Sequence, residues 1–134
     1  KDSEKTVKVI AGKFNSTEGP VNKHNVQPLY FDVVLNKDKI FDFNLPETHN
    51  SFIYLINGEI KVGEKKHERI TDSKLVLLTK GSKLKVESLI KSNFLLISGK
   101  PIGEKIARGG PFVMNTKAEI LEAINDYHNG TFVK

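Results

Sequence analysis

The fold of this chain is decided by one stretch of its sequence, Phe52-Ile53-Tyr54-Leu55-Ile56-Asn57-Gly58-Glu59-Ile60-Lys61-Val62. Two apolar segments flank the pair Asn57-Gly58, and both contain the β-branched residues that favour strands. Asparagine and glycine both tolerate a positive φ, so this pair can close a tight two-residue turn. The stretch therefore predicts a β-hairpin between residues 53–56 and 59–62.

Similar short apolar segments recur on both sides of this stretch. Turn residues separate them, at Gly63-Glu64, Lys80-Gly81-Ser82 and Lys91-Ser92-Asn93. Short strands with this punctuation are typical of an antiparallel sandwich or barrel. The further strands that we expect are Thr6 to Phe14, Leu29 to Leu35, Leu75 to Leu78, Leu84 to Leu89 and Phe94 to Ile97.

The pattern changes after Gly99. We expect strands over about residues 6–99, a loop over 100–115 and one helix over 116–129. Thr116 and Glu119 have the spacing of a capping box, and Gly130 supplies a left-handed stop. Because the helix is amphipathic, one of its faces must be buried, either on the barrel or against a partner domain. The apolar stripe consists of Ile120, Leu121, Ile124 and Tyr127.

Five motifs follow one another along the chain. They are Val9-Ile10-Ala11-Gly12, Glu18-Gly19-Pro20-Val21, Pro46-Glu47-Thr48-His49-Asn50-Ser51-Phe52-Ile53-Tyr54, Gly99-Lys100-Pro101-Ile102-Gly103-Glu104 and Ala107-Arg108-Gly109-Gly110-Pro111-Phe112-Val113-Met114-Asn115-Thr116. In this order they resemble the C-terminal part of pirin-family proteins. The resemblance covers nearly the whole sequence and is densest towards its end.

This resemblance implies both a fold and a division of labour. Members of the family look like two tandem cupin barrels with the metal in the N-terminal barrel, and the present chain resembles the other one. The implied fold is mainly β, a cupin-type (RmlC-like) jelly roll, that is, an antiparallel β-barrel or sandwich with one C-terminal α-helix. At 134 residues the chain is too short for two such barrels, so we expect one domain over residues 1–134.

Composition limits the setting in which the protein works. No apolar run approaches the roughly 20 residues that span a bilayer, so we expect no membrane partner. The chain has no cysteine, which excludes disulfides and thiolate metal sites and agrees with a reducing compartment. We expect a cytoplasmic location, with the nucleus as an alternative in a eukaryote. The sequence begins at Lys1 although its one methionine is Met114, so we expect that a tag or a preceding domain was removed upstream.

The basic excess does not indicate a specific nucleic-acid partner. The formal net charge is +5, but of the 21 basic residues only Arg69 and Arg108 are arginines. Arginine is the residue that grips phosphate or guanine with a planar fork, whereas scattered lysines solvate a surface. Lys83 and Lys85 alternate with Leu84 and Val86, as expected for the outer side of a strand.

We expect no metal and no cofactor in this chain. A cupin site needs imidazoles and a carboxylate that converge from neighbouring strands. The first cupin motif ends in a glycine, here Gly58, and counting back from it reaches Asn44, Pro46 and Asn50 where the ligands would stand. Residues 75–97 contain no histidine for the second motif. The resemblance implies iron in the N-terminal domain of the family instead.

His49 stands in the most suggestive context of the four histidines, since Glu47 precedes it and Asn50 follows it. Together with Asn50 it is a candidate for contact with a ligand or a partner domain at the barrel mouth. The alternative, which we favour for a lone histidine, is a side chain held by hydrogen bonds at a strand edge.

Arg108 and Phe112 are the other two candidates for an interface or ligand contact, because the family resemblance is densest there. An arginine beside a proline-phenylalanine turn typically donates hydrogen bonds to carbonyls, so we favour a fixed intramolecular contact. No residue of the chain is assigned a catalytic role, since it has no cysteine and no Gly-x-Ser-x-Gly elbow.

The leading hypothesis is a metal-free structural and interaction module. It would pack against a metal-bearing N-terminal cupin barrel or a second copy of the chain, and it should expose an apolar face. One alternative is an iron-dependent quercetin 2,3-dioxygenase activity of the full-length pirin-like protein, in which this chain alone would have no activity. Two others are a transcriptional co-regulator that binds another protein and a barrel that binds a small ligand. For the last, Phe31, Phe52 and Tyr54 are the expected wall residues.

Overall fold

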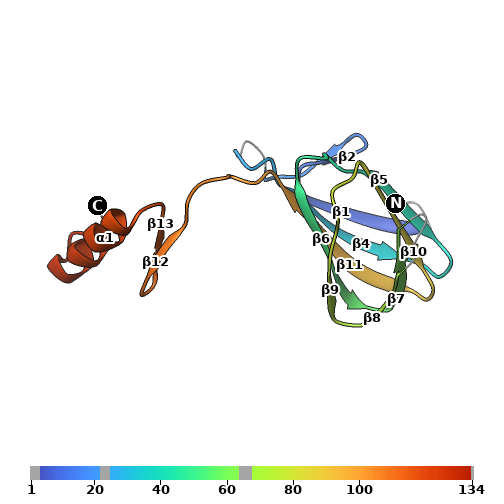
Figure 1. Cartoon of the computed structure of the whole chain (residues 1–134). Coiled ribbons are helices and arrows are strands. Elements are labelled where there is room, and N and C mark those ends of the chain that lie inside the picture. Colours follow the sequence, from blue (N-terminus) through green and yellow to red (C-terminus); the bar gives the residue numbers. More distant parts are fainter. Residues whose placement is uncertain (1–3, 22–24, 64–67, 134) are drawn as a thin grey trace. The chain divides into compact units, whose positions relative to one another are not determined.

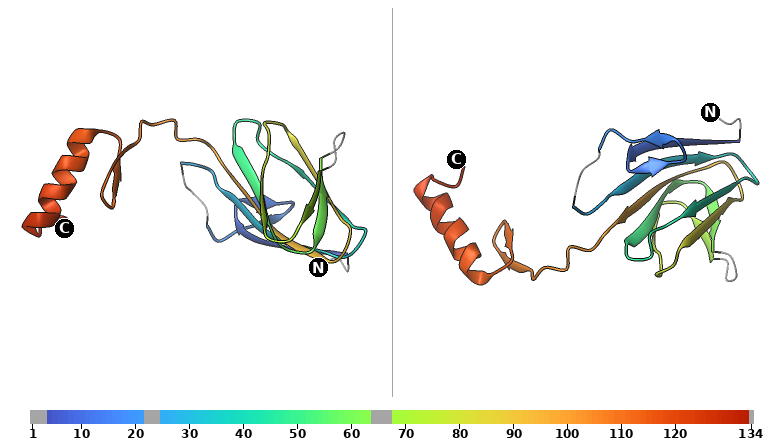
Figure 2. Two further views of the ribbon diagram at one scale, coloured as in Figure 1. Left: turned by 60° about the horizontal axis from the view of Figure 1, so that its bottom comes forward. Right: turned by 90° about the horizontal axis from the view of Figure 1, so that it is seen from above.

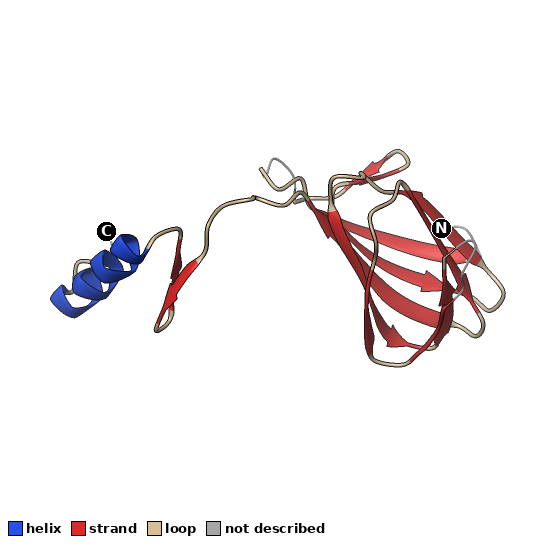
Figure 3. Cartoon of the chain, in the orientation of Figure 1, coloured by secondary structure: helices blue, strands red, loops and turns tan. Residues whose placement is uncertain are grey.

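Short antiparallel strands dominate the computed structural model, which describes residues 4–21, 25–63 and 68–133. The chain separates into two compact units, Lys1–Pro101 and Ile102–Lys134. The first unit is a β-barrel and the second contains a small hairpin and the helix (Figures 1 and 3). The prediction of one domain over residues 1–134 stays a prediction, and each unit is described by itself.

The barrel unit contains two principal sheets. The larger has five strands in the order β1-β4-β11-β6-β9, and the smaller has four in the order β5-β10-β7-β8. Figure 2 shows them as two layers around a common interior. The strands are β1 (Lys5–Ala11), β2 (Lys13–Phe14), β3 (Thr17–Glu18), β4 (Leu29–Leu35), β5 (Ile40–Asn44), β6 (Asn50–Asn57), β7 (Glu59–Val62), β8 (Glu68–Thr71), β9 (Lys74–Leu77), β10 (Lys83–Ser88) and β11 (Ser92–Gly99).

All strand pairings within these two sheets are antiparallel. Neighbours in a sheet are mostly distant in sequence, as in a jelly roll. The mainly β, cupin-type architecture predicted from the sequence is therefore confirmed.

The predicted hairpin at Asn57-Gly58 is wrong. β6 and β7 lie in different sheets, and each is paired on both sides with other strands, so the turn carries the chain from one sheet to the other. Gly58 has a φ of 100°, whereas Asn57 is not among the residues with positive φ, as a two-residue hairpin turn of the Asn-Gly type would require. The Gly58 N–H donates to Asp72 Oδ1 (2.6 Å) instead of closing a hairpin.

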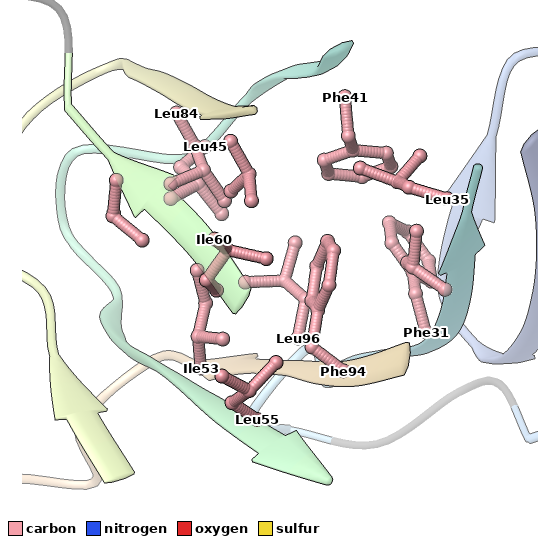
Figure 4. Packing of buried hydrophobic residues seen from close by; sticks show 13 residues of the cluster. Phe31, Leu35, Phe41, Leu45, Ile53, Leu55, Ile60, Leu84, Phe94 and Leu96 are labelled. Atoms are coloured by element: carbon pink, nitrogen blue, oxygen red, sulfur yellow. The ribbon is translucent and has the colours of Figure 1, made fainter. Parts of the chain in front are cut away.

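The interior of the barrel is a continuous apolar core (Figure 4). The four-stranded sheet supplies it with alternate residues, so Phe41, Leu84, Val86 and Ile60 point inward, while their neighbours along the strands, most of them charged, are half-buried or exposed. The buried cluster consists of Phe31, Val33, Leu35, Phe41, Leu45, Ile53, Leu55, Ile60, Val62, Leu84, Val86, Phe94 and Leu96.

The predicted strand over residues 6–14 is divided. Gly12, with a φ of 78°, separates β1 from β2, and a Cβ added to it would lie 2.4 Å from Leu29 Cδ2. The break lets β2 and β3 form a small hairpin that brings the Phe14 ring onto the core.

The second unit contains β12 (Ala107–Gly109), β13 (Phe112–Met114) and α1 (Lys117–Asn129). β12 and β13 form an antiparallel hairpin within residues 100–115, where we expected a loop. Gly110, at a φ of 54°, makes the turn possible. Gly109 lies so close to the helix that an added Cβ would be 2.4 Å from Ile120 Cγ2.

The helix begins and ends as predicted. Thr116 and Glu119 form the capping box, and Gly130 stands in the left-handed conformation at the C-terminal end. The buried face differs from the predicted stripe, because it consists of Ile120 and Ala123, while Leu121 and Tyr127 are 64% and 66% exposed within the described structure.

Candidate functional site

Within the described residues, the side chains that β5 and β10 direct into the barrel are apolar except for one serine. The pairing places Leu84 opposite Phe43 and Val86 opposite Phe41, and Leu45 continues this lining beyond the end of β5. The buried Ser88 Oγ is hydrogen-bonded to backbone carbonyls at the end of β10. The apolar side chains have no donor atom for iron, so these residues do not fit the metal that the fold family implies.

Of the three positions reached by counting back from Gly58, Asn44 and Pro46 are exposed. Asn50 is exposed as well, whereas Phe43 and Leu45, the neighbours of Asn44, are directed into the core. Over the described ranges 4–21, 25–63 and 68–133, no three histidine, cysteine, aspartate or glutamate side chains form a group that could hold a metal ion.

Aromatic rings occupy the interior instead. The rings of Phe31 and Phe43 meet edge to face with centroids 5.0 Å apart, and those of Phe41 and Phe94 do so at 5.7 Å. Phe14 stacks on Phe41 at 5.7 Å. Edge-to-face and offset contacts of this kind stabilise a core beyond the burial of their area alone. The centre of the barrel is therefore packed with phenyl groups.

The three residues that were expected to line a small-ligand site do not share one surface. Phe31 is completely buried in the core, whereas Phe52 and Tyr54 alternate along β6 with the buried Ile53 and Leu55 and so lie on its outer side. A hollow of about 390 Å³ does open beside the barrel. Its lining is mostly aliphatic and includes Leu45, Val62, Val76, Leu78 and Leu84, with Lys83 and Lys85.

His49 is buried, with 5% of its surface exposed. Its Nδ1 lies 3.1 Å from Ser98 Oγ, and Ser51 Oγ donates to the same Ser98 oxygen at 2.8 Å. Burial lowers the pKa of His49 from its ordinary value, and the positive charges of Lys80 and Lys100 lower it further. The imidazole is thus a buried, hydrogen-bonded side chain, and the choice between this role and contact with a ligand or a partner domain stays a prediction.

Asn50 is held by Lys80. The Lys80 ammonium donates to Asn50 Oδ1 (2.9 Å), to the His49 carbonyl (3.0 Å) and to the Thr48 carbonyl (3.2 Å). Nothing in the sequence indicates this contact, because Lys80 stands in a lysine-glycine turn 30 residues away from Asn50.

Arg108 and Phe112 lie in the second unit. Arg108, on β12, is exposed, and the structure assigns it no hydrogen bond or ion pair with another described residue. Phe112 is half-buried, and its ring centroid lies 5.1 Å from that of Phe132 and 6.2 Å from that of Tyr127. The carbonyl contacts expected for Arg108 are not observed, because its position on the hairpin leaves the guanidinium in solvent.

The outer side of the five-stranded sheet carries an apolar surface whose location was not predicted from the sequence. On it Phe52 pairs with Leu77 and Ile97, and Tyr54 pairs with Leu75 and Leu95, so that two apolar rows cross β9, β6 and β11. Leu77 and Leu75 are 76% and 57% exposed. We call this set the apolar face: Phe52, Tyr54, Leu75, Leu77, Leu95 and Ile97.

The outer side of the four-stranded sheet has the opposite character. Its exposed or half-buried residues are mostly charged, and Lys61 pairs there with Glu87 at 4.0 Å. Such a surface is stable in water. The charged residues are Asp42, Glu59, Lys61, Arg69, Lys83, Lys85 and Glu87.

Two antiparallel sheets closed over an apolar core define a cupin-type barrel. The family model described as the pirin C-terminal cupin domain matches residues 30–133, and the chain belongs to this family. It is 33% identical over 133 residues to the pirin-like protein of Caulobacter vibrioides, covering 98% of this chain and 47% of that protein.

Two further comparisons agree with this family assignment. The chain is 34% identical over 127 residues to pirin of Homo sapiens, covering 92% of this chain and 43% of the human protein. The crystal structure of quercetin 2,3-dioxygenase from Acinetobacter baumannii superposes with a TM-score of 0.84 at 30% identity, over 98% of this chain and 45% of that one. The chain thus spans about half the length of the relatives that it matches.

Within the described part of the chain, no helical segment has the length and apolar character needed to cross a bilayer.

Proposed function

We propose that this chain is a metal-free C-terminal cupin barrel that acts as a structural and interaction module beside a metal-bearing N-terminal barrel. The observation that carries the proposal is the aromatic and aliphatic lining at Phe41, Phe43, Leu45, Leu84 and Val86, where a cupin enzyme of the iron type needs imidazoles and a carboxylate. These side chains offer no donor atom to a metal ion, and they fill the centre of the described barrel.

The length of the relatives supports a role beside another domain. They are about twice as long as the present chain, and the matching family model describes a C-terminal domain. The exposed apolar face is a second support, because soluble monomers rarely leave such surfaces uncovered.

A second candidate function is quercetin 2,3-dioxygenase activity of the full-length protein. It is favoured by the similarity to the Acinetobacter structure of that name. In this case the chemistry would belong to the preceding domain, and the present barrel would contribute by supporting it.

Metal analysis tests the proposal directly. We expect the purified chain, incubated with excess Fe²⁺ and desalted, to retain far less than one iron per molecule and to show no turnover of quercetin. The full-length product of the same gene, treated in parallel, should retain iron. Stoichiometric iron together with turnover in this chain alone would contradict the proposal.

A further inference from the structure

We propose that the apolar face on β9, β6 and β11 is the surface through which this barrel packs against the domain that precedes it in the full-length protein. The inference rests on the proposed function and adds to it the location of the contact. It also differs from the interface residues expected in the barrel, since His49 is buried and the exposed Asn50 is bound by Lys80.

Apolar residues are distributed differently along the strands of the two sheets. β6, β9 and β11 carry continuous apolar runs, Phe52 to Ile56, Leu75 to Leu78 and Phe94 to Ile97, whereas β7 and β10 of the four-stranded sheet alternate apolar residues with charged ones. Strands that are apolar on both sides are typical of sheets covered on both faces. The core covers only one side of these three strands, so their sequence indicates that the other side is covered as well.

Polar groups border the apolar face on the side of β4 and β1. On the next strand, β4, Tyr30 pairs with Ile97, and Asp32 pairs with Leu95. Asp32 lies 3.7 Å from Lys8 of β1, an ion pair at the other edge of the sheet. An apolar centre with polar groups at its rim is the usual anatomy of a protein interface. The contact is therefore expected to centre on Leu75, Leu77 and Tyr54 rather than on β1.

The length of the relatives identifies the occupant. They are about twice as long as this chain, and the matching family model is that of a C-terminal domain, so a comparable length of chain is expected before the matched part. It would join the barrel just before β1, which begins at Lys5 and belongs to the same five-stranded sheet. A domain tethered by a short linker is present at an effective concentration of about millimolar, which favours it over any free protein as the cover of this face.

The absence of cysteine makes a clean accessibility experiment possible. Single cysteines are introduced as Leu77→Cys and Leu75→Cys on the apolar face, as Lys83→Cys on the charged sheet and as Val113→Cys on the C-terminal hairpin. The rate of alkylation by iodoacetamide is then followed at each site by peptide mass spectrometry, both in the full-length product of the native gene and in the 134-residue chain. Thermal unfolding verifies that each variant is folded, and the two apolar-face sites serve as independent reporters.

We expect alkylation at Leu77→Cys and Leu75→Cys to be at least tenfold slower in the full-length product than in the isolated chain, while Lys83→Cys reacts at the same rate in both. If Val113→Cys alone is protected in the full-length product, the barrel is an interaction module but its apolar face is not the contact. If no site is protected, the proposed function fails together with this inference.

Two other occupants would also be recognised. Slow alkylation of Leu77→Cys in the isolated chain, with the mass of a dimer in sedimentation equilibrium, would show that a second copy covers the face. The same slow reaction in a monomer would assign the cover to the chain's own C-terminal unit. Either result would overturn the inference.

Discussion

At the scale of single residues, His49 and Gly58 each lie against a serine of β11, Ser98 and Ser92 respectively. His49 is enclosed at the barrel wall by Ser98, with Lys80 and Lys100 as the nearest charges that act on it. A protonated imidazole there would be both desolvated and repelled.

This burial makes the stability of the barrel depend on pH. The pKa of His49 is below its ordinary value of about 6.5 in the folded state, so on acidification the unfolded chain binds a proton first. The stability that neutral His49 provides is therefore complete above about pH 6.5 and is lost as the pH falls towards the folded-state pKa. We expect His49→Gln to lose less stability than the wild type between about pH 7.5 and pH 5.5 in urea unfolding.

The exposed His128 supplies the control for this measurement. His128→Gln should lose as much stability as the wild type over the same interval. If His49→Gln follows the wild-type curve as well, another group is responsible for the acid sensitivity.

At the scale of elements, the turn at Gly58 connects the two sheets. A Cβ at this position would lie 2.3 Å from Ser92 Oγ and 2.6 Å from Ser92 Cα, and the φ of 100° is unfavourable for any residue with a side chain. Ser92 Oγ also accepts from the Glu59 N–H at 2.9 Å, so a displaced Ser92 would leave that donor without its partner.

We therefore expect Gly58→Ala to lower the free energy of unfolding by about 2 to 4 kcal/mol. The matched control is Gly81→Ala, where an added Cβ meets nothing within 4 Å. That variant should remain within about 0.5 kcal/mol of the wild type. Equal losses for the two alanine variants in urea titrations would contradict the assigned role of the Gly58 turn.

The elements also show what could and could not be predicted from the sequence. The capping box at Thr116 and Glu119 was predictable because its two hydrogen bonds join residues three positions apart. The partner of β6 was not, because the local Asn-Gly signal favours a hairpin while β9 and β11 compete for both of its edges. Local turn chemistry restricts the path of the chain without determining which strands become neighbours.

The candidate site was predicted unevenly for the same reason. The buried set on β10 follows from its strict alternation, but the exposure of Asn44 could not be read from a count that starts 14 residues away at Gly58, because it depends on how β5 pairs. The apolar face could have been recognised from the unbroken apolar runs of β6, β9 and β11. Its rows depend on pairings between residues far apart in the sequence.

At the scale of the whole molecule, the two units differ greatly in the amount of core that they contain. The barrel unit contains the main hydrophobic cluster, whereas in the described part of the second unit the buried apolar residues are Ile120 and Ala123. A segment of about 33 residues without disulfide or metal rarely folds alone.

We expect a fragment of residues 1–101 to unfold cooperatively on heating and to keep its β-sheet circular dichroism. A fragment of residues 102–134 should show no cooperative transition and reduced helicity. If the 1–101 fragment is itself unfolded, the two units depend on each other for stability, as the prediction of a single domain over 1–134 requires.

The position of β9 at the end of the described five-stranded sheet has a practical consequence for handling the protein. Its residues Leu75 to Leu77, with Leu78 beyond them, combine high β-propensity with an edge that can accept another strand, which is the sequence character of segments that form fibrils. Lys74 and Lys80 flank the segment, and their charges oppose the stacking of one copy on the next. Because salt screens such charges, the barrel produced without its neighbour should stay in solution longest in dilute, low-salt buffer and aggregate fastest in concentrated salt.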